Sequence, residues 1–155
     1  MKVEQMMSRD VKTCGEGEPL VRAVQLMWEH DVGAVPVVDQ QGMVVGMITD
    51  RDCCMAAYTQ GRRLDEIVVR SAMSTKVQTC APGDTLETVT QMMKRAQVRR
   101  VPVVDKKNKL VGMISLCDLS RAAEKEPNQR VREQYMQQVE GTLATVTKPR
   151  TSARA

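Results

Sequence analysis

The sequence predicts an α+β fold in which two β-α-β-β-α repeats pack as one pseudo-symmetric module. The first observation is an internal duplication: residues 7–57 align with residues 73–123 without a gap, and 22 of the 51 aligned positions are identical. The second observation is that both copies show the same succession of helical and strand-like patterns. A single unit of this size is close to the lower limit for independent stability. We therefore expect the two copies to bury a shared core.

The residue pattern of each copy predicts the same elements: a short extended segment, a helix, two strands joined by a polar turn, and a last helix. Apolar residues in 20–28 recur at intervals of three and four and form one apolar face, and 86–96 repeat this pattern. The last helix starts after Thr49 in the first copy and after Ser115 in the second. The preceding segments are 11–14, 18–30, 34–39 and 43–49 in the first copy and 77–80, 84–97, 100–105 and 110–115 in the second.

These patterns divide the chain into four parts. We expect a first repeat at 3–60, a linker at 61–70, a second repeat at 71–125 and a polar C-terminal extension at 126–155. Within the linker, a short helix is expected at 64–69. The extension begins with a polar stretch of helical character and is expected to be disordered from Gly141 onward, where Thr, Arg and Ala dominate.

The composition excludes several classes of function. The net charge is only +4, and the basic residues are dispersed among acidic ones, so a nucleic-acid footprint is not expected. Phe is absent and only two Tyr and one Trp are present, which leaves little for stacking on bases. The apolar stretches are too short to span a bilayer, and the five cysteines are an odd number. We expect a soluble, cytoplasmic protein.

The end of each predicted hairpin carries the most informative motif. Residues 46–52 and 112–118 both follow the pattern Gly, two apolar residues, Ser or Thr, two variable residues and Asp. The hydroxyl sits where a strand becomes a helix, and backbone N–H groups at that point favour an anion such as phosphate. The carboxylate one turn later suits the vicinal hydroxyls of a ribose. The same spacing also suits an N-cap and its capping partner, and spacing alone favours that structural role.

Catalytic and metal-binding constellations are lacking in the sequence. His30 is the only histidine and lies near the end of a predicted helix, so no nucleophile–base pair is expected. Cys53 and Cys54 have no second pair at zinc spacing. Cys14 and Cys80 occupy equivalent repeat positions, where core packing is expected and redox sensing is the alternative. We therefore expect no enzymatic activity.

The two copies resemble the CBS domain, named after cystathionine β-synthase, and the tandem resembles a CBS pair, or Bateman module. The resemblance is carried by the Val-Pro-Val-Val-Asp runs at 35–39 and 101–105, the glycine motifs ending at Asp52 and Asp118, and the Met-Ser pairs that open each copy. It covers about residues 3–123 and implies a regulatory module. The ligands it implies are AMP, ADP or ATP, with S-adenosylmethionine, NAD or a cyclic dinucleotide as further possibilities.

The resemblance also implies roles for particular residues. Asp52 and Asp118 take the ribose, and Thr49 and Ser115 approach the phosphate. The adenine is expected beside the first short strand of each copy. The residues implied there are Val11, Thr13, Cys14, Val77, Thr79 and Cys80.

The two copies differ just before the Val-Pro-Val-Val run. The second copy has Arg99 and Arg100, whereas the first has Gly33 and Ala34. Guanidinium groups are strong phosphate donors. Since phosphates in this family lean toward the opposite repeat, the better site is expected to pair Asp52 with the two arginines, leaving the cleft of Asp118 weaker or empty. The alternative is that both arginines are simply exposed surface charges.

Arg51 lies inside the first motif, where it either adds to the positive field around a phosphate or pairs with Asp50. The overall expectation is a ligand-sensing module that binds an adenine nucleotide, forms a homodimer and signals to an unknown effector protein. The helix faces in 20–28 and 86–96 are expected to mediate dimerisation, because two small sheets cannot cover both. The alternative is a non-enzymatic interaction or scaffold protein with empty clefts.

Overall fold

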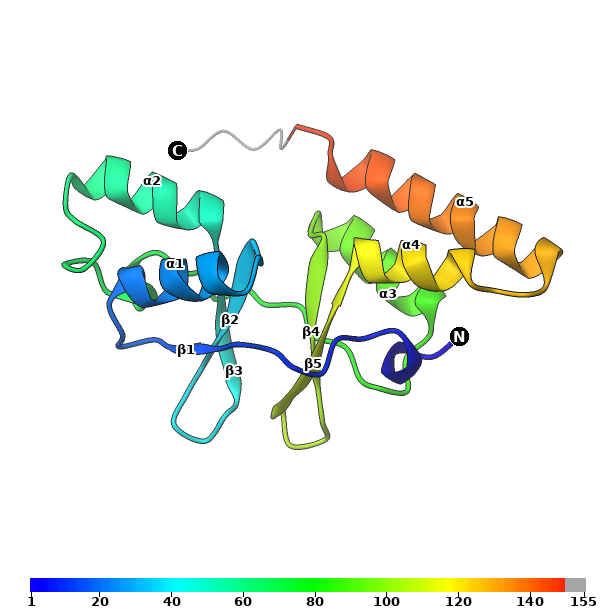
Figure 1. The fold of residues 1–155 in the computed structure, drawn as a ribbon, viewed down its shortest axis with the longest axis horizontal. Coiled ribbons are helices and arrows are strands. Elements are labelled where there is room, and N and C mark those ends of the chain that lie inside the picture. The colour runs from blue at the N-terminus through cyan, green and yellow to red at the C-terminus, as the bar shows by residue number, and fades with distance from the viewer. Residues whose placement is uncertain (150–155) are drawn as a thin grey trace.

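A computed structural model of the protein describes residues 1–149 and shows two halves lying side by side (Figure 1). Each half has a small sheet toward the middle of the molecule and its helices on the outer side. The first half contains β1 (Cys14–Gly15), α1 (Leu20–Glu29), β2 (Ala34–Val38), β3 (Val44–Thr49) and α2 (Asp50–Gln60). The second contains α3 (Leu86–Ala96), β4 (Arg100–Val104), β5 (Leu110–Ser115) and α4 (Leu116–Glu124), followed by α5 (Gln129–Val146). Short 3₁₀ helices occupy Val3–Gln5 and Val69–Ser71.

The two predicted hairpins form with the same register. In β2 and β3, Val35 lies opposite Ile48, and in β4 and β5 Val101 lies opposite Ile114. The predicted extended segments are much shorter than expected. The segment predicted at 11–14 forms only the two-residue strand β1, which is parallel to β2. The segment predicted at 77–80 contributes a single parallel bridge from Cys80 to β4.

The extended segments are short because the chain crosses between the two sheets at these points. Ser8 pairs with Met113 of β5 through two hydrogen bonds of 2.9 Å before the chain reaches β1. Ser74 pairs in the same way with Met47 of β3, with hydrogen bonds of 2.8 and 2.9 Å. Residues 9–13 and 75–79 therefore run from one half to the other. We call them the crossing segments.

Two strand glycines make this exchange possible. A Cβ atom on Gly46 would lie 2.5 Å from the sulfur of Met73, and one on Gly112 would lie 2.6 Å from the sulfur of Met7. Each glycine thus allows the methionine that opens the other copy to pack directly on the strand. Both copies have glycine at this position because a methionine packs on the strand in the same way in each half.

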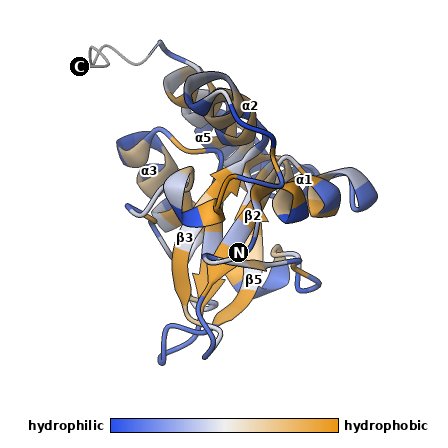
Figure 2. Ribbon diagram, turned by 90° about the vertical axis from the view of Figure 1, so that its left-hand side faces the viewer, coloured by the Kyte–Doolittle hydropathy of each residue, from blue (hydrophilic) through white to orange (hydrophobic). Residues whose placement is uncertain are grey.

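Each half has its own hydrophobic cluster. Leu20 and Ile48 are fully buried in the first, and their equivalents Leu86 and Ile114 are fully or nearly fully buried in the second. Figure 2 shows this as hydrophobic strands β2, β3 and β5 framed by hydrophilic turns and outer helix surfaces. The shared core of the prediction is therefore better described as two clusters.

The linker does not form the predicted helix at 64–69. Its residues form turns, because the carbonyl oxygen of Ile67 accepts a hydrogen bond of 2.7 Å from Leu20 N at the start of α1. Ile67 is fully buried in the first cluster. The linker thus packs on the first half. Its helical turn begins only at Val69, as the 3₁₀ helix Val69–Ser71.

The C-terminal extension is more ordered than predicted. Helix α5 runs through Gly141 to Val146, so the expectation of disorder from Gly141 is wrong for these residues; 150–155 lie outside the described residues. Asn128 caps the helix by accepting a hydrogen bond of 3.1 Å from Val131 N. α5 packs along α3 and α4, burying Val139 and Thr142 (Figure 1).

This helix gives the two halves different outer faces. Thr90 of α3 is only 1% exposed, whereas its equivalent in α1, Val24, is partly exposed. The apolar α3 residues that we expected to mediate dimerisation are buried inside the second half, in the cluster that also contains Val139 of α5. The matching α1 residues Leu20, Ala23 and Met27 are buried in the cluster of the first half, so neither predicted face is available as a whole. Among residues 1–149, every helix is too short or too polar to traverse a lipid bilayer.

Candidate functional site

The junction between β3 and α2 forms a reciprocal capping box. Thr49 Oγ1 accepts a hydrogen bond of 3.1 Å from Asp52 N. In return, Asp52 Oδ2 accepts hydrogen bonds of 2.9 Å from Thr49 N and 2.7 Å from the Thr49 hydroxyl. The structural role that spacing alone favoured is therefore present. It occupies only one of the two carboxylate oxygens of Asp52.

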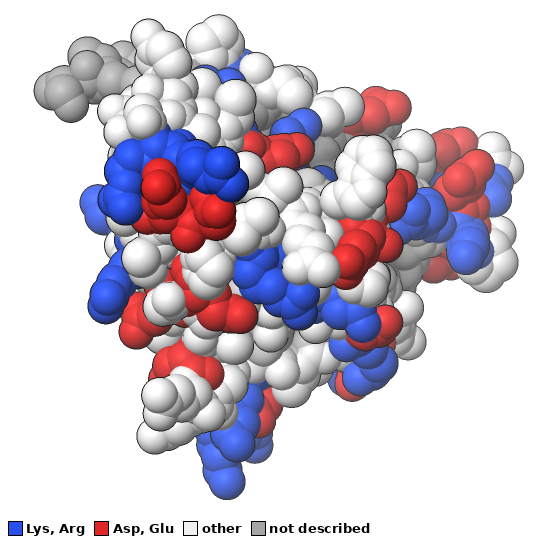
Figure 3. Space-filling model, turned by 60° about the vertical axis from the view of Figure 1, so that its left-hand side comes forward, with Lys and Arg blue, Asp and Glu red and all other residues white. Residues whose placement is uncertain are grey.

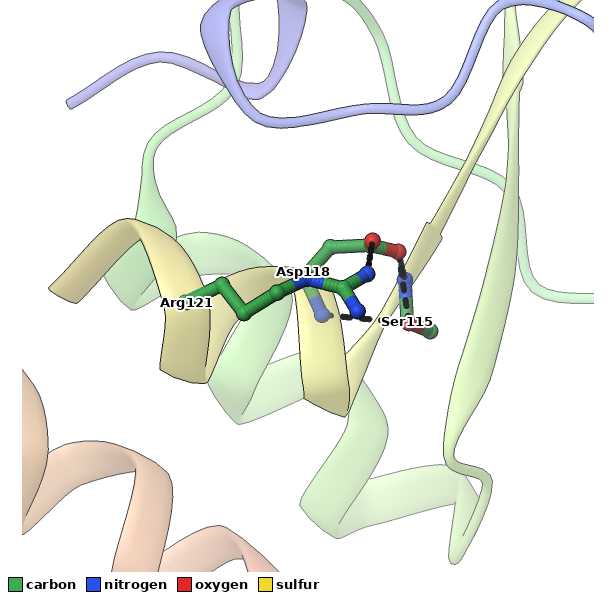
Figure 4. Close-up of polar contacts among 3 residues, drawn as sticks. All are labelled: Ser115, Asp118 and Arg121. Atoms are coloured by element: carbon green, nitrogen blue, oxygen red, sulfur yellow. Dashed lines mark hydrogen bonds and ion pairs between the residues drawn. The ribbon is translucent and has the colours of Figure 1, made fainter. Parts of the chain in front are cut away.

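The junction between β5 and α4 has the same capping box. Asp118 Oδ2 accepts hydrogen bonds of 2.8 Å from Ser115 N and 2.5 Å from the Ser115 hydroxyl, while Ser115 Oγ accepts from Asp118 N at 3.2 Å. Here the second oxygen is also used: Asp118 Oδ1 forms an ion pair of 2.5 Å with Arg121 Nη2 (Figure 4). The two motifs thus share the same capping box. They differ at Oδ1, which is bound by an arginine in Asp118 but not in Asp52.

Arg100 reaches from the second half to the first motif. A Cβ atom on Gly33 would lie 3.5 Å from Arg100 Nη2 and 3.1 Å from Asp50 Oδ2. The absence of a side chain at Gly33 thus leaves the space into which the Arg100 guanidinium extends, beside the first residue of α2. The positive charge lies near the amino terminus of that helix, which itself favours an anion.

Arg99 and Arg51 are exposed and point to no partner. Neither side chain forms a hydrogen bond or ion pair within residues 1–149, so the alternative in which the Arg51 side chain pairs with Asp50 is not seen. The contact between these two residues is through the backbone, where Arg51 N donates a hydrogen bond of 2.7 Å to Asp50 Oδ1. The carbonyl oxygen of Arg99 accepts Leu116 N at 2.9 Å, which helps to start α4. The structure therefore brings Arg100, but not the Arg99 side chain, to the first motif.

The residues expected beside the adenine lie on or next to the crossing segments. Val11, Thr13, Val77 and Thr79 are partly buried there, while Cys14 and Cys80 are buried against the sheets. A hollow of about 720 Å³ lies beside the second crossing segment. Its lining includes Thr79, Cys80 and residues 81–84 and 104–106, but neither Ser115 nor Asp118. The structure thus does not join these predicted residues into one hollow.

The three buried thiols are poorly reactive. Burial raises the pKa of Cys14 and that of Cys80 to about 12, and that of Cys53 to about 11. A thiol with so high a pKa carries almost no thiolate at neutral pH, and the thiolate is the reactive form. The core-packing interpretation of Cys14 and Cys80 is therefore favoured over redox sensing. Residues 1–149 contain no cluster of three or more His, Cys, Asp or Glu that could hold a metal ion.

Comparison with known proteins places this arrangement in a family. The family model of the CBS domain matches twice, at residues 3–58 and 69–125. The chain belongs to the CBS domain family. It is 40% identical over 118 residues to the CBS domain-containing protein YhcV of Bacillus subtilis, covering 76% of this chain and 82% of YhcV. CBS proteins of this kind are regulatory modules, and the match to a tandem pair agrees with the internal duplication.

Two solved structures of CBS proteins have the same fold. The CBS domain pair of protein MJ0100, in complex with 5′-methylthioadenosine and S-adenosyl-L-methionine, superposes with a TM-score of 0.72 at 24% identity, covering 79% of this chain and 94% of that one. CBSX2 in complex with AMP superposes with a TM-score of 0.70 at 24% identity, covering 80% and 96%. At this identity the likeness concerns the fold alone.

Some relatives are much longer than this chain. The homoserine O-acetyltransferase of Methanococcoides burtonii is 30% identical over 119 residues, but the match spans only 23% of its length. An uncharacterised protein of Methanopyrus kandleri, MK0525, is matched over 61% of its length. The CBS pair is therefore one part of the acetyltransferase, separate from the rest of that enzyme.

Sequence reasoning missed the ion pair between Asp118 and Arg121. The signal was available, since an acidic and a basic residue three positions apart on a predicted helix are neighbours. Residues shared by the two copies do not reveal this ion pair, because Arg121 aligns with Met55.

Proposed function

We propose that this CBS pair is a regulatory module that binds an adenine nucleotide between its two halves, with Asp52 as the ribose-binding carboxylate. AMP, ADP and ATP are the favoured ligands, and S-adenosylmethionine and NAD are further candidates. The family and the adenosine-type ligands named for MJ0100 and CBSX2 support the ligand class. The observation that carries the choice of site is the unpaired Oδ1 of Asp52, which has no partner within residues 1–149.

A vicinal diol needs an acceptor that is held in place and still has a free lone pair. The capping box holds Asp52 rigidly, because its Oδ2 is tied to both the backbone and the hydroxyl of Thr49. Its Oδ1 then remains available to the ribose hydroxyls. Hydrogen bonds to a charged acceptor are stronger than neutral ones. The capping role and the ligand role are thus compatible in one side chain.

The phosphate is proposed to lie near the start of α2. Arg100 extends to this point from the other half, and Arg51 and Arg99 add exposed positive charge. A ligand that contacts Asp52 on one half and Arg100 on the other couples the positions of the two halves. Such a ligand shifts the arrangement only if it binds one arrangement more tightly than another. An effector protein is proposed to respond to that shift.

Thermal unfolding with AMP, ADP, ATP, S-adenosylmethionine and NAD, each with and without Mg²⁺, tests this proposal. A ligand at 100 times its dissociation constant adds about 2.7 kcal/mol of stability. For a chain of this size that corresponds to a rise in Tm of roughly 5–10 °C. Arg100→Gln should weaken AMP binding while leaving the unliganded Tm nearly unchanged. The proposal fails if none of the five ligands shifts the Tm.

The assembly proposal now rests on the first half alone. Val21, Trp28, Val32 and Tyr58 are 41%, 87%, 40% and 81% exposed on or beside α1 and α2, and no helix covers them within residues 1–149. The equivalents of Val21, Trp28 and Tyr58 in the second half are the charged residues Glu87, Lys94 and Glu124, so that half has no matching apolar face. We propose a homodimer formed through this open face, in place of the two faces expected from the sequence.

The same open face supports the second candidate function, a non-enzymatic interaction or scaffold protein with empty clefts. A dimer without any nucleotide-dependent change in stability would favour that alternative. In the view of Figure 3, basic and acidic side chains alternate without a continuous field of one sign, which supports neither nucleic acid nor an anionic membrane as a partner. The five unpaired cysteines support a cytoplasmic location.

A further inference from the structure

We propose that Arg121 competes with ribose hydroxyls for the carboxylate of the second motif, so that each chain binds a single nucleotide, at Asp52, at concentrations that fill that site. This inference rests on the proposed function and adds to it the residue that decides between the two equivalent motifs. Arg99 and Arg100 favour the first motif through the phosphate. Arg121 concerns the ribose and acts independently of them.

The internal duplication supplies a matched comparison within one molecule. Both carboxylates accept the backbone N–H and the hydroxyl of their capping residue through Oδ2, at 2.9 and 2.7 Å in the first motif and 2.8 and 2.5 Å in the second. The difference lies at Oδ1. In the second motif this oxygen is bound by Arg121, and in the first motif the equivalent position is Met55, which carries no charge.

The position of Arg121 puts it in direct competition with a diol. Figure 4 shows its guanidinium pointing back along α4 to the outer oxygen of Asp118, while Ser115 lies on the other oxygen. The side chain of Asp118 is only 11% exposed. A ribose hydroxyl that approaches Oδ1 of this carboxylate therefore competes with Arg121.

A ligand can displace Arg121 from Asp118, because the side chain of Arg121 is itself 67% exposed. Solvent-exposed ion pairs are weak. We therefore expect Arg121 to weaken ribose binding at the second motif by roughly two- to fivefold rather than to abolish it. Without a basic residue at Gly33 or Ala34 to hold the phosphate, that loss leaves the second motif empty at AMP concentrations that fill the first.

An exchange of the two equivalent residues tests the inference. Isothermal titration with AMP is carried out on the wild-type chain, Arg121→Met, Met55→Arg and the double exchange. We expect one AMP per chain for the wild type and a second, weaker site in Arg121→Met. Met55→Arg places a guanidinium three residues from Asp52 and should weaken the first site by roughly two- to fivefold. Arg121→Lys keeps a cation and should retain a single site.

The outcomes separate this inference from the proposed function. Two AMP per wild-type chain, or one site unchanged in Arg121→Met, overturns the role of Arg121 while leaving nucleotide binding intact. Weaker binding in Arg121→Met also overturns it, since Arg121 would then contact the ligand. If the wild type binds no AMP and Arg121→Met binds one, the competing role of Arg121 holds and the assignment to Asp52 fails. If no variant binds AMP, both fail. Thermal unfolding without ligand confirms that each variant is folded.

Discussion

Replacing each motif carboxylate by alanine separates the capping role from the ligand role. Asp52 and Asp118 hold equivalent positions in equivalent capping boxes, so Asp52→Ala and Asp118→Ala remove the same two hydrogen bonds from the fold. If capping were the only role, the two variants would behave alike in every assay. If Asp52 binds ribose, they should differ in binding and agree in stability.

The contacts set the expected magnitudes. Loss of a capping side chain costs about 1 kcal/mol of unfolding free energy, within a range of about 0.5–2. Asp118→Ala also loses the ion pair with Arg121, but that exposed pair adds less than about 1 kcal/mol. Both variants should therefore lose roughly 1–2 kcal/mol, or roughly 2–8 °C in Tm. Losing one charge-assisted hydrogen bond of about 1.5–3 kcal/mol should weaken AMP binding to Asp52→Ala about 10- to 150-fold.

Two assays on the same preparations decide the matter. Urea denaturation gives the free energy of unfolding, and isothermal titration gives the affinity for AMP. We expect similar losses of stability and a loss of affinity in Asp52→Ala only. The reasoning is refuted if Asp118→Ala binds AMP less tightly than Asp52→Ala. It is equally refuted if both variants keep the wild-type affinity.

Three further outcomes follow from the packing. Gly46→Ala should lower the unfolding free energy by about 1–3 kcal/mol, since its Cβ meets a methionine sulfur at 2.5 Å. Gly17→Ala, whose Cβ meets nothing within 4 Å, is the control in urea denaturation, and an equal loss in both would contradict the close approach. A disulfide reagent at pH 8 should modify the exposed Cys54 and Cys117 rapidly and the three buried thiols only after unfolding; fast reaction of all five would contradict their raised pKa values. Trp28→Glu should convert a dimer to a monomer in sedimentation velocity, and an unchanged dimer would exclude the open α1 face as the interface.

Local patterns were sufficient to predict most of the elements. The gap-free duplication set the order of helices and strands, and both hairpins form with the turns expected between them. The capping boxes at Thr49 and Ser115 also followed from the spacing of a hydroxyl and a carboxylate on either side of a helix start. These features depend on residues that lie close together in the sequence.

Features that depend on distant residues could not be predicted in the same way. The pairing of Ser8 with β5 is set by how the two halves meet, and no local pattern encodes it. The docking of α5 on α3 and α4 depends on a few apolar residues in a polar helix, such as Val139. The approach of Arg100 to Gly33 likewise became apparent only from the structure, although both positions had been noted as a difference between the copies.

A crystal structure of the full chain grown with AMP tests the central claim most directly. The account predicts one AMP per chain, with its ribose hydroxyls on Asp52 Oδ1, its phosphate near Arg100, and the Arg121–Asp118 ion pair intact in the second motif. A nucleotide bound at Asp118 with Asp52 unoccupied would contradict the account. So would AMP bound away from both carboxylates.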